Sequence, residues 1–250
     1  MITPVGFTYE KFYFPVGEMH VKGFKSNPGQ YIDIEFNFER NDEIIELLLL
    51  VNTIKHEGCF PGTLYMPYVP FSRQDRINEY GECFSLEVFA ELLNSCGFQK
   101  VVVTDPHSDV TPALIKNCSI ISQEYVFRRY FKGKNEFYLI SPDGGSLKKI
   151  YKLAAVVDCY DVIECSKLRN TKTGEITGVK VHFDDFGNKD CYIVDDICDG
   201  GRTFIEIAKE LQKKKAGRII LMVTHGFFTK GIQVFDGLID EIYTSNGRIK

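Results

Sequence analysis

The chain has 250 residues, of which 44% are apolar and 26% charged, and its formal net charge is −4. This balance excludes a disordered or fibrous chain, and the acidic charge argues against a nucleic-acid or polyanion binder. The longest apolar run, at residues 44–51, is far shorter than the roughly 18 residues of a membrane span. The amino-terminal MITPV has no export-signal pattern, so we expect a soluble chain that does not associate with membranes.

The eight cysteines do not have the spacing of a zinc site, because no pair forms a CxxC and no short cluster of thiols and imidazoles occurs. Several lie inside apolar runs, such as CYIV at residues 191–194. We therefore expect buried, free thiols in a reducing compartment, and hence a cytoplasmic protein.

Strands and helices are predicted to alternate through the first half of the chain. Residues 31–38 place an apolar side chain at every second position, which is typical of a half-buried strand. Helices are predicted over 41–55 and 85–96, and strands over 63–69 and 100–104. The last strand is a continuous apolar run of the kind that is covered on both faces in a parallel sheet.

The second half repeats this rhythm. Strands are predicted over 136–141, 158–166, 179–183, 191–194 and 218–223, helices over 146–155 and 203–215, and a hairpin turn over 173–175. Such alternation is typical of βαβ units with right-handed crossovers. We therefore predict an α/β fold of two tandem halves, each a mainly parallel sheet flanked by helices, with domains over 1–135 and 136–250.

Polar loops follow four of the predicted strands, at the edge where open parallel sheets bind ligands. In DDICDGGRT at 195–203, the glycines let backbone N–H groups face a phosphate, and the two acids suit sugar hydroxyls or a magnesium shell. The other three loops are FSRQDR at 71–76, DPHS at 105–108 and SPDGG at 141–145. Any one of them also fits an ordinary turn, but four together favour a ligand site.

In order and spacing, these loops resemble those of the ribose-phosphate diphosphokinases, the phosphoribosyl pyrophosphate synthetases. PYVPFSRQDR at 67–76 is similar to the family's ATP-binding stretch, and the similarity continues through THG at 224–226 and IDEIY at 239–243. The resemblance implies two tandem halves of the type I phosphoribosyltransferase fold. The first half would carry the ATP loops, and the second the ribose-phosphate loop and a mobile catalytic loop.

The resemblance also implies a reaction, in which the C1 hydroxyl of a ribose attacks the β-phosphorus of ATP and AMP leaves. ATP would be bound by Phe14, Glu18, Arg73, Gln74 and Asp75. His107 and Asp143 would hold a magnesium ion, and His107 would also be catalytic.

The remaining site residues implied by the resemblance lie in the second half. Asp195 and Asp196 would bind the ribose hydroxyls, and Lys167 and Arg169, a Lys-x-Arg motif, would close over the transition state. The 5-phosphate would be bound by Asp199, Gly200, Gly201, Arg202 and Thr203. The implied partners are small molecules, ATP and a ribose phosphate or ADP-ribose, together with further copies of the chain in a dimer or larger homo-oligomer. The family contributes Phe14-type residues from a neighbouring subunit.

The chain departs from the family pattern in three places. Val16 replaces the acid of the family's Phe-x-Asp-Gly-Glu segment. DGGRT at 199–203 replaces Asp-Thr-Gly-Gly-Thr, and the planar fork of Arg202 suits a larger 5-substituent such as the diphosphate of ADP-ribose. The chain also ends soon after Tyr243 and is short between Asn37 and Asn41, so the family's hexamer and its regulatory site are not assumed.

Two alternative functions stay open. A type I phosphoribosyltransferase would share the loop at 195–203, but it has no need of Arg73 to Asp75 or of the pair His107 and Asp143. A catalytically silent regulatory homologue would alter the mobile loop, whereas Lys167 and Arg169 are both present.

Overall fold

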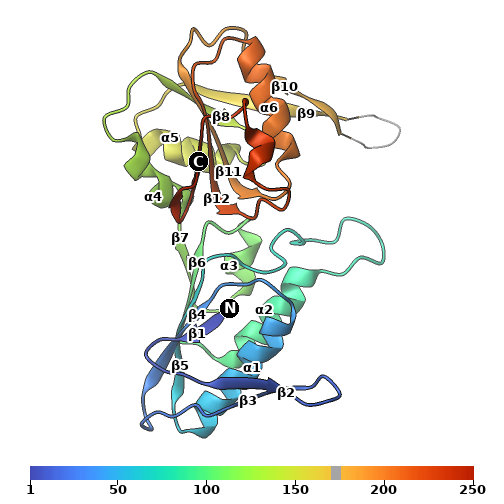
Figure 1. Ribbon diagram of the computed structural model, residues 1–250, viewed down its shortest axis with the longest axis vertical. Coiled ribbons are helices and arrows are strands. Elements are labelled where there is room, and N and C mark those ends of the chain that lie inside the picture. The colour runs from blue at the N-terminus through green and yellow to red at the C-terminus, as the bar shows by residue number, and fades with distance from the viewer. Residues whose placement is uncertain (170–175) are drawn as a thin grey trace. The chain divides into compact units, whose positions relative to one another are not determined.

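The computed structural model describes residues 1–169 and 176–250, with side chains for 1–166 and 178–250. The chain forms two compact units, Met1–Ile121 and Ser122–Lys250. Each contains a mainly parallel sheet with helices against it (Figure 1), as the alternation of strands and helices predicts. The predicted hairpin turn at 173–175 lies outside the described residues.

The first unit is built on a five-stranded sheet of order β1-β4-β5-β6-β7. Its strands are β1 (Ile2–Pro4), β4 (Tyr31–Phe36), β5 (Phe60–Met66), β6 (Lys100–Thr104) and β7 (Cys118–Ile121), of which only β1 is antiparallel to its neighbour. The connecting helices are α1 (Asp42–His56), α2 (Ser85–Cys96) and the short α3 (Val110–Leu114). A separate hairpin consists of β2 (Glu10–Tyr13) and β3 (Met19–Lys22).

The sheet of the first unit has one well-buried face. Alternate side chains of β4, Ile32, Ile34 and Phe36, are fully buried with apolar residues of α1 and α2 in one core. The prediction that residues 100–104 are covered on both faces is therefore wrong in part. Val101 and Val103 are buried, but Val102 on the opposite face is partly exposed, because α1 and α2 lie on the same side of the sheet (Figure 1).

The second unit contains a seven-stranded sheet of order β10-β9-β8-β11-β12-β13-β14. Its strands are β8 (Phe137–Ser141), β9 (Val162–Arg169), β10 (Ile176–Val181), β11 (Asp190–Cys198), β12 (Ile219–Gly226), β13 (Glu241–Thr244) and β14 (Gly247–Arg248). Five of them, β9-β8-β11-β12-β13, are parallel. The helices are α4 (Gln123–Phe127), η1 (Arg128–Phe131), α5 (Leu147–Val156), α6 (Arg202–Lys213) and η2 (Ile232–Phe235).

The boundary between the units lies 14 residues earlier than the boundary drawn from the sequence at residue 135. Helices α4 and η1 belong to the second unit, because Phe127 and Phe131 are buried in a core with Phe137 and Leu139 of β8. The segment between β6 and β8 contains only elements of four or five residues. Elements of this length give no periodic apolar pattern from which a boundary could be read.

Among the described residues, no helix is both long and apolar enough to cross a membrane; the longest, α1, has 15 residues. All eight cysteines are free, and five of them are buried. Cys83 is an exception to the prediction of buried thiols, since it lies exposed in the long loop between β5 and α2. Burial raises the pKa of the Cys96 thiol to about 11 and that of the Cys198 thiol to about 12.

We expect Cys83 to react with a thiol reagent much faster than any other cysteine of the native chain. A reagent needs access to a thiolate, and the buried thiols offer neither access nor charge. Release of the chromophore from Ellman's reagent should show one fast thiol, and all eight after denaturation. Cys83→Ser should remove the fast phase, and its persistence in that variant would contradict the assignment.

Candidate active site

The loop between β11 and α6 has the backbone form of an anion-binding turn. Gly201 caps α6 in the left-handed region, at φ +79°. A Cβ atom there would also lie 2.4 Å from the Phe235 ring, so conformation and space both require glycine. The helix begins at Arg202, which leaves the first backbone N–H groups of α6 facing the loop.

Contacts from the loop after β12 fix this turn in place. The Thr229 hydroxyl donates to Asp199 Oδ1 at 2.7 Å, and the Thr229 N–H donates to the Asp199 carbonyl at 3.2 Å. The aliphatic part of Lys230 lies against Gly200, with Cε 3.4 Å from where a Cβ atom would stand. Sequence reasoning missed Thr229 and Lys230, and their only signal is that they follow the carboxyl end of a strand.

Two acids lie side by side in β11. The strand is longer than predicted, so Asp195 and Asp196 belong to it, and Asp195 is in register with Val223 of β12. The Asp196 N–H donates to Asp195 Oδ1 at 2.9 Å. Burial, and then the neighbouring Asp196 carboxylate, raise the pKa of Asp195 well above its ordinary value. Asp143 adds to this repulsion, so the three acids share one region of the second unit.

Lys149 offsets part of this negative charge. Its Nζ lies 3.8 Å from Asp196 Oδ2, and its side chain is only 25% exposed. The residue lies in the first turn of α5, directly after the SPDGG loop. No sequence signal distinguishes Lys149, because a lysine near a helix start is usually on the surface.

Asp143 organises the turn between β8 and α5. Its Oδ1 atom accepts hydrogen bonds from the N–H groups of Gly145 at 3.0 Å and Ser146 at 3.3 Å. The hydroxyls of Ser141 and Ser146 donate to its carbonyl. The carboxylate is thus held in one orientation at the carboxyl end of β8.

In the first unit, Asp75 joins the loops that follow β5 and β6. It is only 5% exposed and forms a two-point contact with Arg76, at 2.8 and 3.2 Å. The Arg76 guanidinium, a hydrogen bond from Ser108 and the charge of His107 lower the pKa of Asp75 below its usual value. The structure thus brings the RQDR and DPHS loops together, and Asp75 is a buried link between them.

Other predicted ATP contacts of this unit are exposed. Arg73 and Gln74 are exposed in the turn that follows Phe71. Phe71 has φ +61° and packs its ring against Phe38 and Phe89. Leu86 at the start of α2 donates its N–H to the Gln74 carbonyl at 3.3 Å. The backbone of this loop is therefore fixed while the side chains at 73 and 74 remain accessible.

Phe14 and Glu18 lie elsewhere in the first unit. They flank the turn of the β2–β3 hairpin, where the Phe14 N–H donates to the Glu18 carbonyl at 2.8 Å. Phe14 is 46% exposed and packs against Phe12. Within this unit, Figure 1 shows the hairpin at the opposite end from the loop that follows β5. The structure does not bring Phe14 and Glu18 together with Arg73 and Gln74.

The predicted catalytic pair lies at the end of β9. In backbone register, Lys167 faces Val179 and Arg169 faces Ile176 of β10. The side chains of Lys167 and Arg169 lie outside the described part of the chain. β9 is the direct neighbour of β8, the strand that leads to Asp143.

The donors fit a magnesium ion that binds partly through substrate phosphates. Over the described side chains, no three His, Cys, Asp or Glu residues are placed to hold a metal together. Magnesium commonly keeps several waters and binds through one or two protein carboxylates plus substrate phosphates. Asp143, whose charge acts on Asp195, supplies that type of oxygen donor.

We expect Asp195→Asn to stabilise the chain at neutral pH. The folded-state pKa of Asp195 is raised, so the folded chain holds a proton that the unfolded chain releases above about pH 4. Stability is therefore lost as the pH rises from about 4 through the raised pKa, and asparagine removes this loss. Urea unfolding at pH 7 should show a gain of about 1 kcal/mol that vanishes near pH 4.

Asp184→Asn is the matched control for this measurement, because the Asp184 side chain is fully exposed. It should change the free energy of unfolding by less than about 0.5 kcal/mol at either pH. A destabilised Asp195→Asn variant at pH 7 would show that the carboxylate is stabilised, and not strained, by its surroundings.

Comparisons with known proteins identify the family and the fold. Residues 14–97 match the family described as the N-terminal domain of ribose phosphate pyrophosphokinase, and residues 109–235 match the phosphoribosyl transferase domain. The solved phosphoribosylpyrophosphate synthetase of Mycobacterium smegmatis has a similar fold, with a TM-score of 0.80 at 20% identity, covering 95% of this chain and 80% of that one.

Named relatives cover most of the chain. The ribose-phosphate pyrophosphokinase of Mycoplasma genitalium is 31% identical over 246 residues, which is 94% of this chain and 73% of the relative. That of Pyrococcus abyssi is 30% identical and covers 93% of this chain and 81% of its own length. For the relative from Mycoplasmopsis pulmonis, at 29% identity, this chain spans 65% of the length. The chain belongs to the ribose-phosphate pyrophosphokinase family of transferases.

Proposed function

We propose that this chain transfers the β,γ-diphosphate of ATP to the C1 hydroxyl of a ribosyl acceptor and releases AMP. The observation that carries this proposal is the link that Asp75 makes between the RQDR loop and the loop of His107 and Ser108. A phosphoribosyltransferase needs only the acids and glycine turn of the second unit. The assembled loops of the first unit favour a chain that also binds a nucleotide.

The acceptor ribose would be bound in the second unit. Asp195 and Asp196 would take its hydroxyls, since one carboxyl with a raised pKa beside another offers both a donor and acceptors. The phosphate next to C5 would lie at the start of α6, against the N–H groups of the turn capped by Gly201 and beside Arg202 and Thr203.

ATP would be bound mainly by the first unit. Arg73 and Gln74 are exposed on a fixed backbone and would contact the nucleotide, whereas buried Asp75 would position the loop. Phe14 and Glu18 lie on the exposed hairpin and would reach the nucleotide of a second copy of the chain. This part of the proposal requires a homo-oligomer.

His107 and Asp143 would hold the magnesium ion, which when bound neutralises charge on the ATP phosphates. The C1 hydroxyl oxygen forms a bond to the β-phosphorus and releases its proton to solvent. The bond from that phosphorus to the oxygen retained by AMP breaks, and AMP leaves. Negative charge builds up on oxygens around phosphorus, and Lys167 and Arg169 would stabilise it from the end of β9. Eight free cysteines are consistent with a reducing compartment, which we propose to be the cytoplasm.

We propose ribose 5-phosphate as the default acceptor and a ribose with an extended 5-substituent, such as ADP-ribose, as the second. Arg202 is exposed at the first position of α6, and Lys230 lies against Gly200 of the same turn. Two cations at one phosphate turn suit a diphosphate better than a single phosphate.

A coupled assay for AMP release tests the reaction, run with ATP and Mg²⁺ and either ribose 5-phosphate or ADP-ribose. We expect AMP with at least one acceptor and a fall of two or more orders of magnitude in kcat for Lys167→Ala, because charge neutralisation in the transition state is lost. The matched control is Lys180→Ala, an exposed lysine on neighbouring β10, which should keep full activity.

No AMP with either acceptor would favour the silent regulatory homologue. Consumption of phosphoribosyl pyrophosphate with a nucleobase, without AMP formation, would favour the phosphoribosyltransferase. Unchanged kcat in Lys167→Ala would remove the catalytic role of this lysine.

Arg202→Gly tests the acceptor pocket. It should lower kcat/KM for ADP-ribose about tenfold or more relative to ribose 5-phosphate, because a two-point contact with the distal phosphate is lost. Arg202→Lys keeps the charge without the planar fork. Its ratio of kcat/KM for ADP-ribose to kcat/KM for ribose 5-phosphate should lie between those of the unsubstituted chain and Arg202→Gly. If the ratio of the two kcat/KM values stays the same in both variants, Arg202 does not select the acceptor.

A further inference from the structure

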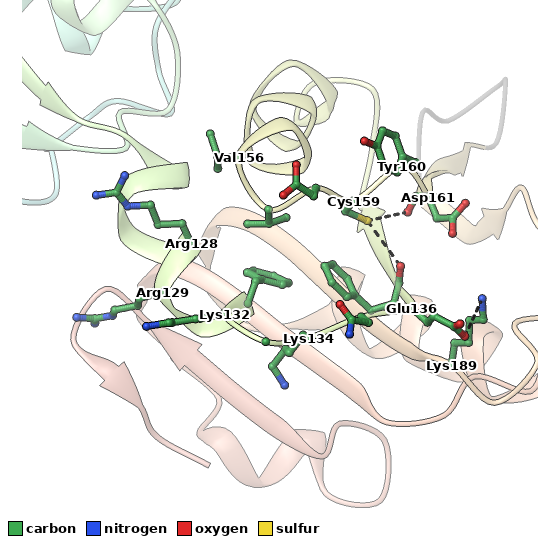
Figure 2. Close-up of a pocket in the computed structure, with 16 residues that line it drawn as sticks. Arg128, Arg129, Lys132, Lys134, Glu136, Val156, Cys159, Tyr160, Asp161 and Lys189 are labelled. Atoms are coloured by element: carbon green, nitrogen blue, oxygen red, sulfur yellow. Dashed lines mark hydrogen bonds and ion pairs between the residues drawn. The ribbon is translucent and has the colours of Figure 1, made fainter.

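A pocket of about 710 Å³ opens in the second unit, at the edge of the sheet where strands β8, β9 and β11 begin (Figure 2). It is lined by residues that precede or begin three strands: Glu136 and Phe137 at β8, Asp161 before β9 and Lys189 before β11. The acids of the candidate active site lie toward the carboxyl ends of these strands. Asp195 lies six positions after Lys189 along the chain, which is roughly 20 Å in a strand. The pocket is therefore not part of the candidate active site.

One wall of this pocket concentrates positive charge. Arg128, Arg129, Lys132 and Lys134 come from a single stretch of seven residues that contains no acid. Figure 2 shows them along one side of the pocket, with Lys189 at the other end beside Glu136. The volume lies in the range of sites for small molecules of nucleotide size.

Three of these cations lie against aromatic rings and not against carboxylates. Arg128 lies 4.8 Å from the centre of the Tyr125 ring, Arg129 lies at the same distance from Tyr130, and Lys134 Nζ lies 5.5 Å from Tyr192. Within the described residues, none of these three, nor Lys132, forms an ion pair with an acid. A ring orients a cation without neutralising it, so the full positive charge remains available to an anion.

The remaining surface of the pocket suits the other parts of an anionic ligand. Phe131 and Phe137, with ring centres 5.0 Å apart, add apolar surface to the lining. Tyr160 stands on the rim opposite the cations and is 93% exposed. A flat ring could pack on this tyrosine, and the adjacent Asp161 could accept hydrogen bonds from sugar hydroxyls.

We propose that this pocket binds the diphosphate group of a small molecule, with the phosphates against Arg128 and Lys132. The same chemistry is present in a nucleoside diphosphate and in inorganic pyrophosphate. A diphosphate carries enough charge to engage several cations at once, and the four unneutralised side chains match it. Binding here is independent of the proposed reaction, because the pocket shares no residue with the candidate active site.

The test uses Tyr160→Trp as a reporter, because the chain contains no tryptophan and this side chain is exposed on the pocket rim. We expect its fluorescence to change saturably with ADP and with pyrophosphate, and not with adenosine. Adding Arg128→Glu and Lys132→Glu should raise the ligand concentration at half-saturation at least about tenfold. The matched control adds Lys25→Glu and Lys116→Glu, two exposed lysines of the first unit, and should leave it unchanged.

Equilibrium dialysis provides a second readout, since the candidate active site also binds phosphates. With labelled ADP or pyrophosphate, the number of molecules bound per chain should fall by one in the Arg128→Glu, Lys132→Glu variant and stay constant in the control. Tighter binding of ADP than of pyrophosphate would identify a nucleoside diphosphate as the ligand of the pocket. Tighter binding of pyrophosphate would identify the inorganic ion. A fluorescence response to adenosine alone, or equal stoichiometry in all variants, would overturn the proposal.

Discussion

The double burial of strand β11 is the constraint on which the second unit depends. Cys191 and Ile193 face a core shared with α6, and Tyr192 and Val194 face a second core shared with α5. All four side chains are at most 2% exposed. A shift of the strand by one residue would exchange every side chain between two cores of different shape, so packing strongly disfavours any other register. The strand is also hydrogen-bonded on both edges, to β8 and to β12. As a result, packing and strand pairing fix the backbone that leads into Asp195 and Asp196.

This rigidity explains how the chain tolerates an unfavourable pair of charges. Burial and mutual repulsion disfavour ionised Asp195, and the packing of β11 supplies the compensating stability. Asp75 in the first unit is the opposite case, because Arg76 and Ser108 stabilise its charge and the residue serves to hold two loops together. Asp195 and Asp75 therefore have different roles. One is strained and faces a proposed substrate, and the other is satisfied and fixes the backbone that presents Arg73 and Gln74.

Local patterns in the sequence were sufficient to predict the bounds of a helix or strand where a long element buries one clear face. Helix α2 and strand β6 begin and end where the apolar spacing predicts, because their buried side chains repeat with the period of the element. The same patterns missed α3, β7 and α4, which have four or five residues each. They also ended β11 before Asp195, because acids rarely occur inside a buried strand. Thr229 and Lys230 could not be found from local pattern at all, since their roles depend on a contact with Asp199 and Gly200 across about 30 residues of sequence.

Net charge was the least informative sequence property of this chain. A net charge of −4 predicts no affinity for polyanions. The net charge, however, sums acidic and basic surfaces that the fold places apart. In the second unit, Asp143, Asp195 and Asp196 gather toward the carboxyl ends of the strands, while the cations of residues 128–134 gather at the amino-end edge. The strands between these two edges are buried and rigid. A ligand at the basic edge could therefore affect the acids only if the strands had two alternative positions. The ligand would also have to bind the protein more tightly when the strands are in one position than in the other. Without such a difference, the two edges act as independent sites on one sheet.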